Sequence, residues 1–357
     1  MARIQMFLLA AKKSDHVMTH AVCVALAVIT QLCSIVFCSL AKDSTVPNAL
    51  FKTSSRNVSE TFPLEVTMDW WSESNWILTD IWSMAWLTHA MVGLCKRNVL
   101  GPVSCNPEIH SPVFYLMWVM INIARTYIII MWDEHNVFGA VILTWFLPAL
   151  SFYMLYMSYY NLNECKAWLA INNPDEIGWI RYLTQNGLAL FAWWTLLKAD
   201  VGLGIVLKYK AGLQDPLVST IVLTVVLLCT LTWFIMQSFL FTKYMRYTFT
   251  VYAILILGLG AMFTRSYRIH DFAANTVYCG KILPKSSKCT FKCHICESSS
   301  WFLLSPGFLM LMMTIMSSVH LMSICLYKPP AMEPYVTSES CQTVCQPEGR
   351  SQQKLQN

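Results

Sequence analysis

Long apolar runs recur along this chain of 357 residues, and short polar segments separate them. A membrane-spanning α-helix needs about 20 mostly apolar residues to cross about 30 Å of hydrocarbon. The pattern therefore predicts eight transmembrane helices, at residues 18–41, 76–95, 113–132, 137–160, 182–207, 217–242, 245–263 and 301–327. The predicted fold class is all-α, a polytopic membrane helix bundle.

The first apolar segment has two interpretations. Lys12 and Lys13 precede it and CSLAK ends it, so a signal peptide cut after Ala41 would leave seven transmembrane helices. Its apolar core exceeds the roughly 7–15 residues typical of a signal peptide, which favours a retained helix. The domain prediction is an N-terminal segment 1–41, an extracytoplasmic loop 42–75, a core bundle 76–263, a Cys-rich extracytoplasmic loop 264–300, a last helix 301–327 and a disordered cytoplasmic tail 328–357.

Charges beside the short loops set the predicted orientation, because Lys and Arg concentrate on the cytoplasmic side of membrane proteins. Lys96 and Arg97 close the second predicted helix, and Lys243 and Arg246 lie between the sixth and seventh. With these on the inside, both termini are cytoplasmic. We expect a multi-pass integral membrane protein of the secretory pathway or plasma membrane, with the lipid bilayer as its partner and with Asn57, in the sequence Asn-Val-Ser, open to glycosylation outside.

The loop at 264–300 carries a cluster of cysteines: Cys279, Cys289, Cys293 and Cys296. With the neighbouring His294, their spacing fits either two disulfide bonds or a zinc knuckle. An oxidising compartment favours disulfides. Because the predicted topology places the loop outside the cytosol, we expect disulfides rather than metal, and the spacing does not set their connectivity.

Composition supports the membrane assignment and excludes several function classes. The chain is 56% hydrophobic and 13% charged, against about 25% charged in soluble domains. The formal net charge of +5 gives no indication of nucleic-acid binding. The sequence contains no H-E-x-x-H, G-x-S-x-G or P-loop pattern. We therefore expect a protein that is not an enzyme, with no catalytic residues, no cofactor and no metal site.

A few charged or strongly polar side chains fall inside predicted helices, where a charge costs about 2.5–3.5 kcal/mol on insertion scales. They are Asp80, His89, Asn122, Arg125, Asn186, Lys198 and Asp200. Trp118, Asn122 and Arg125 share one helix face through the spacing i, i+4, i+7. Glycine pairs at 202–204 and 258–260 favour close helix approach, so the fifth and seventh predicted helices are expected near the centre of the bundle.

This polar set has two interpretations. The side chains either line a cavity at membrane depth or pair with one another to lock the helices together. The cavity interpretation predicts the ligand contacts Trp118, Asn122, Arg125, Asn186, Trp193, Trp194, Lys198 and Asp200. His89 is expected to be an ordinary interior histidine, and Trp70, Trp71 and Trp76 an outer aromatic belt.

Four stretches between residues 62 and 263 together resemble the tryptophan-rich sensory protein, or translocator protein, superfamily. They are NWILTDIWSMAWLTHAMVGLC (75–95), SPVFYLMWVMINIARTYIIIMWDEH (111–135), RYLTQNGLALFAWWT (181–195) and KYMRYTFTVYAILILGLG (243–260). The matching features are Ile81-Trp82, Asn122, Trp132-Asp133, the run from Asn186 to Ala189 with Phe191, and Trp194-Thr195.

The resemblance implies a compact five-helix-type bundle with an aromatic cavity for a small amphipathic molecule, porphyrin-like or sterol-like. Several features depart from the family pattern, and Lys198 and Asp200 are unusual for it. WWSESN stands where Thr-Pro-Ala-Gly is expected, and Gly202 stands near the position of a family Asn. The first and last predicted helices and the Cys-rich loop lie outside the resemblance.

The sequence leaves several functions open. The favoured one is binding or transport of a small amphipathic molecule in an aromatic, partly charged intramembrane pocket. The alternative is an ion or proton channel or transporter that uses the same charges. A seven-helix receptor is a lesser alternative. The sequence YMRY at 244–247 is similar to the Asp-Arg-Tyr motif of such receptors, but it lies in the wrong place in the chain. The oligomeric state and the ligand are not set by the sequence.

Overall fold

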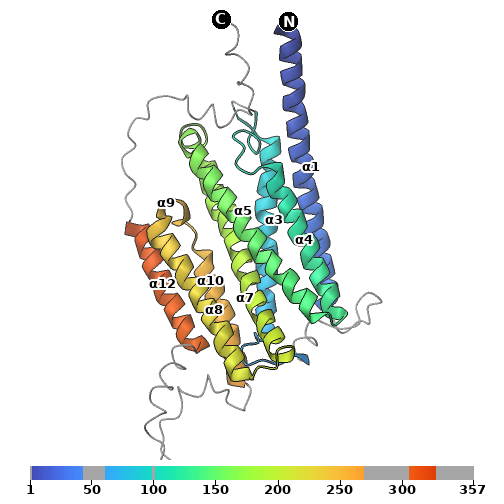
Figure 1. Ribbon diagram of the computed structural model, residues 1–357. Coiled ribbons are helices and arrows are strands. Elements are labelled where there is room, and N and C mark those ends of the chain that lie inside the picture. The colour runs from blue at the N-terminus through green and yellow to red at the C-terminus, as the bar shows by residue number, and fades with distance from the viewer. Residues whose placement is uncertain (1, 43–60, 99–100, 269–304, 327–357) are drawn as a thin grey trace, which may run out of the picture.

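The structure, a computed structural model, describes residues 2–42, 61–98, 101–268 and 305–326, and it is almost entirely helical (Figure 1). The long helices run roughly side by side as a bundle. By length and composition, six described helical segments can cross a membrane: His16–Ala41, Pro112–Asp133, Val137–Asn172, Pro174–Tyr209, Asp215–Leu240 and Pro306–Cys325. The prediction of a multi-pass helical membrane bundle is confirmed at this level.

The elements follow one another with short connections. The long helices are α1 (Ala2–Lys42), α3 (Ser74–Cys95), α4 (Pro112–Asp133), α5 (Val137–Asn172), α7 (Asn186–Tyr209), α8 (Asp215–Ile235), α10 (Thr250–Arg268) and α12 (Pro306–Leu326). The short ones are a 3₁₀ turn (Trp70–Glu73), α6 (Pro174–Trp179), α9 (Thr242–Met245) and π-helical segments at Ile180–Gln185 and Met236–Leu240. Strands β1 (Arg97–Asn98) and β2 (Gly101–Pro102) form a small antiparallel pair.

The predicted count of eight spans is not confirmed. The second and seventh predicted spans form helices α3 and α10. Neither is among the six helical segments that are long and apolar enough to cross a membrane. Helix α3 carries Asp80 and His89, which lower its hydropathy. Helix α10 begins at Thr250 rather than at 245, because the preceding residues form a hydrogen-bonded turn. Asn57, the four loop cysteines and the tail at 328–357 lie outside the described residues.

The boundaries of α4 and α5 follow local sequence signals. Pro112 occupies the first turn of α4, where its missing N–H has no helical partner to lose. The predicted link at 133–136 is a tight turn, in which His135 has a positive φ of 59°. Asn136 caps α5 by accepting a hydrogen bond of 3.1 Å from the backbone N–H of Gly139. Sequence and structure therefore agree on this hairpin.

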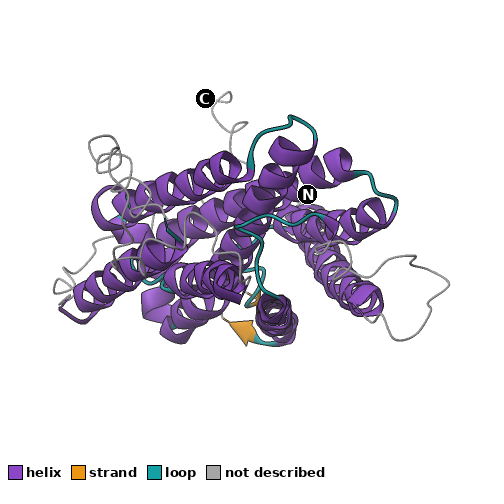
Figure 2. Ribbon diagram, turned by 90° about the horizontal axis from the view of Figure 1, so that it is seen from below, coloured by secondary structure: helices purple, strands orange, loops and turns teal. Residues whose placement is uncertain are grey.

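Helix α7 is the centre of the bundle, as the glycine pairs predicted for the fifth span. In the span that contains α7, 78% of an 18-residue apolar stretch is buried inside the protein. The corresponding share in the other five spans is 22–39%. Helices α3, α5, α8 and α10 all contact α7. Figure 2 shows the bundle from below, where almost all of the described chain is helical. The polar residues Asn186, Thr195 and Asp200 of α7 are therefore enclosed by protein.

Gly187 allows α3 to approach α7, and an alanine there is expected to destabilise the fold. An added Cβ would lie 2.6 Å from Cδ1 of Trp82. The indole of Trp82 is fixed because its N–H donates to the carbonyl of Leu183 at 2.9 Å. We expect Gly187→Ala to lower the free energy of unfolding by about 1–3 kcal/mol, measured by denaturation in mixed micelles.

Gly178 provides the matched control, because an added Cβ there meets nothing within 4 Å. It lies in helix α6, where alanine is favoured over glycine by about 0.5–1 kcal/mol. Gly178→Ala should therefore be neutral or slightly stabilising. Equal stability of the two variants would contradict the close α3–α7 contact.

Candidate functional site

Arg125 and Asp80 form a paired charge between α4 and α3. Arg125 Nη1 and Nη2 donate to Asp80 Oδ1 and Oδ2 at 2.5 and 2.9 Å. Gln31 of α1 also donates to Asp80 Oδ1, at 3.0 Å, and its own carbonyl oxygen accepts from Trp118 Nε1 at 3.1 Å. The cluster joins three helices. The sequence analysis placed Arg125 and Trp118 in a site but missed Gln31, although a buried amide inside an apolar helix is a usable signal.

Lys198 forms a second pair, with Glu73 just before α3. Its Nζ also lies 5.0 Å from the ring centroid of Trp194. The ring of Trp76 lies 6.1 Å from that of Trp194, and the Arg125 guanidinium carbon lies 4.4 Å from the Trp76 ring. Three predicted site residues, Arg125, Trp194 and Lys198, are thus brought together through Trp76, which the sequence analysis assigned to an interface belt.

The predicted asparagines make contacts with the protein itself. Asn186 Nδ2 donates to the carbonyls of Arg181 and Tyr247, both at 2.9 Å. Its Oδ1 accepts from the N–H of Phe249 at 3.0 Å, and this fixes the turn before α10. Asn122 donates to the carbonyl of Trp118 at 3.1 Å, and its own Oδ1 is buried without a partner among the described residues.

Trp193 and Trp194, both buried, face different neighbours of α7. Trp193 packs against Phe152 and Trp233, with ring centroids 5.9 and 5.7 Å away. Trp194 packs against Trp76. The two tryptophans therefore face different parts of the bundle, and aromatic side chains of the protein pack against both rings.

Asp200 is the exception among the predicted charges. Its side chain is 1% exposed, and neither carboxylate oxygen has a hydrogen-bond partner among the described residues. On one side of it along α7, the ring of Trp193 meets Trp233 of α8; on the other, Gly204 faces Val222 of α8. Since α7 and α8 are antiparallel, this register places Asp200 level with Val226.

The surroundings of Asp200 are apolar. Val222 and Val226 are buried, and the Cys229 thiol of α8 interacts electrostatically with Asp200. The indole N–H groups of Trp193 and Trp233, farther along the same interface, are also buried without partners among the described residues. Buried polar groups are usually hydrogen-bonded, so an unpaired carboxylate in such an interface is a candidate functional group.

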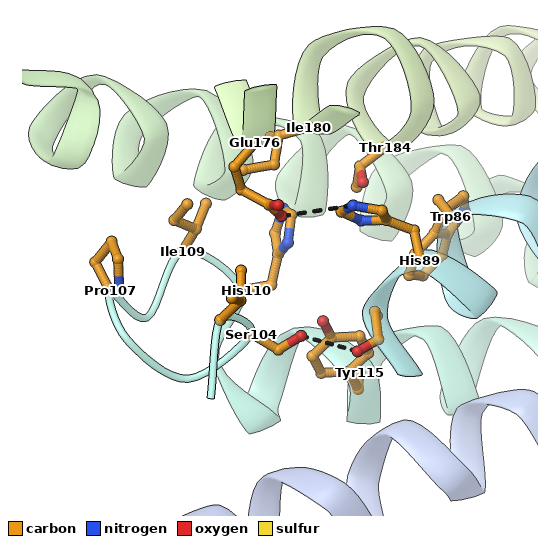
Figure 3. A pocket seen from close by; sticks show the side chains of 12 residues that line it. Trp86, His89, Ser104, Pro107, Ile109, His110, Tyr115, Glu176, Ile180 and Thr184 are labelled. Atoms are coloured by element: carbon orange, nitrogen blue, oxygen red, sulfur yellow. Dashed lines mark hydrogen bonds and ion pairs between the residues drawn. The ribbon is translucent and has the colours of Figure 1, made fainter. Parts of the chain in front are cut away.

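A separate polar cavity lies at the far end of α3 (Figure 3). Its volume is about 20 Å³, and its polar lining comes from α3, the loop before α4, α4 itself, α6 and the π-helical segment. The polar side chains that line it are His89, Ser104, His110, Tyr115, Glu176 and Thr184. No sequence signal indicated this cavity, because its residues come from segments far apart in the chain.

The contacts around the cavity fix some of these groups. His89 Nε2 lies 3.7 Å from Glu176 Oε1, and Figure 3 shows this pair across the cavity. His110 Nε2 lies 3.0 Å from Ser158 Oγ of α5. Ser104 Oγ donates to the carbonyl of Ala90 at 2.8 Å. The sequence analysis interpreted His89 as an interior histidine, whereas it faces a carboxylate in a cavity.

The pH dependence of stability is expected to reflect His110, which lies in the loop before α4. Burial, and next His20 and His89, lower the pKa of His110 from 6.5 to about 3. Between these values the unfolded chain binds a proton that the folded chain does not, so stability falls as pH drops from 6.5 towards 3. Denaturation midpoints measured across this range should therefore decrease with acid, and the decrease should be smaller in His110→Gln. An equal acid sensitivity of that variant would contradict the assignment to His110.

Among the described residues, no group of three or more His, Cys, Asp or Glu side chains is arranged to hold a metal ion. Comparison of the chain with models of known families, with curated proteins and with solved structures found no match. The resemblance to the tryptophan-rich sensory protein superfamily therefore stays a prediction. Function has to be argued from Asp200, the two ion pairs and the polar cavity.

Proposed function

We propose that the protein is a proton-linked membrane transporter in which Asp200 binds and releases the proton. The observation that carries this proposal is the buried Asp200 carboxylate, which has no hydrogen-bond partner among the described residues. Ionisable residues buried within membrane helices are rare and mark ion pathways and proton relays. Arg125 and Lys198, in contrast, each have a carboxylate partner.

The surroundings of Asp200 favour a proton over a metal cation. A bound cation such as Ca²⁺ needs about six or more oxygen ligands, and Mg²⁺ needs an octahedral shell. The register places Asp200 beside valines and a cysteine of α8 instead. A proton needs a single carboxylate oxygen, and the protonated group is neutral, so it is compatible with apolar surroundings.

The α7–α8 interface supplies further support. Trp193 and Trp233 each place a buried indole N–H there without a partner among the described residues. Such groups favour the entry of water, which needs two to four polar partners. When α7 and α8 separate, water that reaches Asp200 would accept its proton. When the two helices pack together again, the carboxyl group would keep the next proton that it has bound.

Proton flux into proteoliposomes tests the proposal. With an imposed membrane potential and a pH-sensitive dye inside, the wild-type protein should carry protons and Asp200→Asn should not. Asp175→Asn is the matched control, because Asp175 is exposed at the start of α6. Dicyclohexylcarbodiimide, which modifies buried protonated carboxyl groups, should label Asp200 and inhibit the flux. Equal flux in wild type and Asp200→Asn would reject the proposal.

Binding of a small amphipathic molecule is the second candidate. It is favoured by Lys198, whose side chain is 24% exposed next to the ring of Trp194. A ligand anion that displaced Glu73 would meet both a cation and an aromatic face. Saturable tryptophan quenching by a porphyrin carboxylate, lost in Lys198→Leu and kept in the exposed-site variant Lys210→Leu, is the expected result. Unchanged quenching in Lys198→Leu would remove this candidate.

A further inference from the structure

The polar cavity at the end of α3 has the features of a ligand site, and proton transport through Asp200 does not use it. We propose that this cavity binds a small protonated amine, of the alkylammonium class, with Glu176 as its counter-ion. The cavity is enclosed by α3, α4, α6 and the loop between α3 and α4. The argument rests on the charge, the aromatic walls and the size of the cavity.

The charge of the cavity favours a cation. Glu176 is mostly buried, and its contact with His89 at 3.7 Å is longer than a hydrogen bond, so the carboxylate can accept a shorter bond from a ligand. His110 is neutral near pH 7 because burial lowers its pKa to about 3. Lys96, which interacts electrostatically with His89 and Glu176, is exposed, and water screens its charge.

The remaining charged groups nearby do not reverse this balance. Glu108 of the same loop interacts electrostatically with Tyr115 in the cavity wall, and its carboxylate is 3.1 Å from His16 of α1. Protonation of His16 would neutralise this pair and leave the charge of Glu176. An anion would meet the Glu176 carboxylate, and no described residue that lines the cavity is a Lys or Arg that could balance it.

The walls suit an ammonium group. Trp86 and Tyr115 are aromatic lining residues, and aromatic faces attract cations. The hydroxyl oxygens of Tyr115 and Thr184, together with Glu176, are acceptors for the N–H donors of an alkylammonium ion. The volume of about 20 Å³ is little more than the 10–15 Å³ or so that one water requires, so the ligand has to be small.

The helix that lines the cavity is irregular at this point, and this is an independent observation. Ile180 and Thr184 belong to the π-helical segment between α6 and α7, and both line the cavity. Short π-helical segments within α-helices are rare and occur frequently at functional sites. Thr184 itself is buried, so its place in the wall is fixed by the helix rather than by a flexible loop.

Equilibrium dialysis with radiolabelled methylammonium and the purified full-length protein in nanodiscs tests the proposal. Wild type should bind one ion per chain saturably. Glu176→Gln should weaken the affinity at least about tenfold, because it removes the buried charge and keeps the shape of the side chain. Asp175→Asn, which removes a neighbouring exposed charge on α6, should leave the affinity unchanged.

Two competitors and one variant make the outcome decisive. Ammonium should compete with methylammonium, whereas tetramethylammonium should not, since it is larger and has no N–H group. Asp200→Asn should bind normally, so failure of this proposal and failure of proton transport are distinguishable. No saturable binding in wild type, or wild-type affinity in a Glu176→Gln protein whose unfolding midpoint is unchanged, would show that the cavity holds water only.

Discussion

Replacing Asp200 by leucine is expected to raise the free energy of unfolding by about 1–3 kcal/mol and to abolish proton transport. A buried polar group without a partner destabilises the folded state by about this amount, and a charged one by more. Asp200 is 1% exposed, and no described residue bonds either of its oxygens. Leucine is apolar and similar in size, so it removes the unpaired group and keeps the contact with α8.

The stability half of this prediction is measured by reversible unfolding in mixed micelles, and the activity half by the dye assay in proteoliposomes. Asp175→Leu is the control, because a surface substitution away from special contacts changes stability by at most about 0.5 kcal/mol. A gain in stability together with a loss of activity is the usual sign of a residue that is kept for function although it destabilises the fold. A large loss of stability in Asp200→Leu would mean that the carboxylate has a structural partner.

The general architecture of the protein could be predicted from the sequence, because hydrophobic length alone identifies membrane helices. The hairpin between α4 and α5 and the central position of α7 were both predicted and are observed. The number of spans was harder to predict. Helix α3 carries polar residues within its apolar sequence, and α10 begins later than predicted. Asn186 illustrates the difficulty: its role in fixing the turn before α10 depends on a contact between residues more than sixty positions apart.

The candidate site could be predicted in part. Residue type identified Arg125, Lys198 and Asp200, because charges inside apolar helices stand out. Asp80 was among the charges expected to pair within the membrane, and it pairs with Arg125. The partner of Lys198 could not be predicted, since Glu73 lies in the turn before α3, outside the predicted helices. The cavity around Glu176 was missed entirely, because it is assembled from several elements that carry no shared motif.

The contrast among the three charges supports different roles for them. Arg125 and Lys198 have carboxylate partners from α3 or the turn before it, which is the arrangement expected of helix locks. Asp200 faces α8, where the register offers valines and a cysteine. The two interpretations of the intramembrane charges, a lock and a functional site, therefore need not exclude each other, because different residues fit each one.

Breaking the Arg125–Asp80 pair should produce the largest loss of stability. Removing one partner of a buried ion pair costs about 3–5 kcal/mol, because the other charge remains buried and uncompensated. The side chains of Arg125 and Asp80 are 5% and 13% exposed, so water replaces little of the lost interaction. We expect Arg125→Leu to lower the free energy of unfolding by this amount, measured in mixed micelles.

The double variant Arg125→Leu/Asp80→Leu distinguishes a lost pair from a general packing defect. It should recover much of the stability, since no buried charge is left and leucine fills part of the space. Lys198→Leu is the matched comparison: its pair with Glu73 is more exposed, at 24% and 31%, and should be worth only about 0–1 kcal/mol. If the two single substitutions at Arg125 and Asp80 add in the double variant, the two side chains act independently and the lock between α3 and α4 is rejected. Recovery would show that the two side chains stabilise the fold as a pair that links α3 to α4.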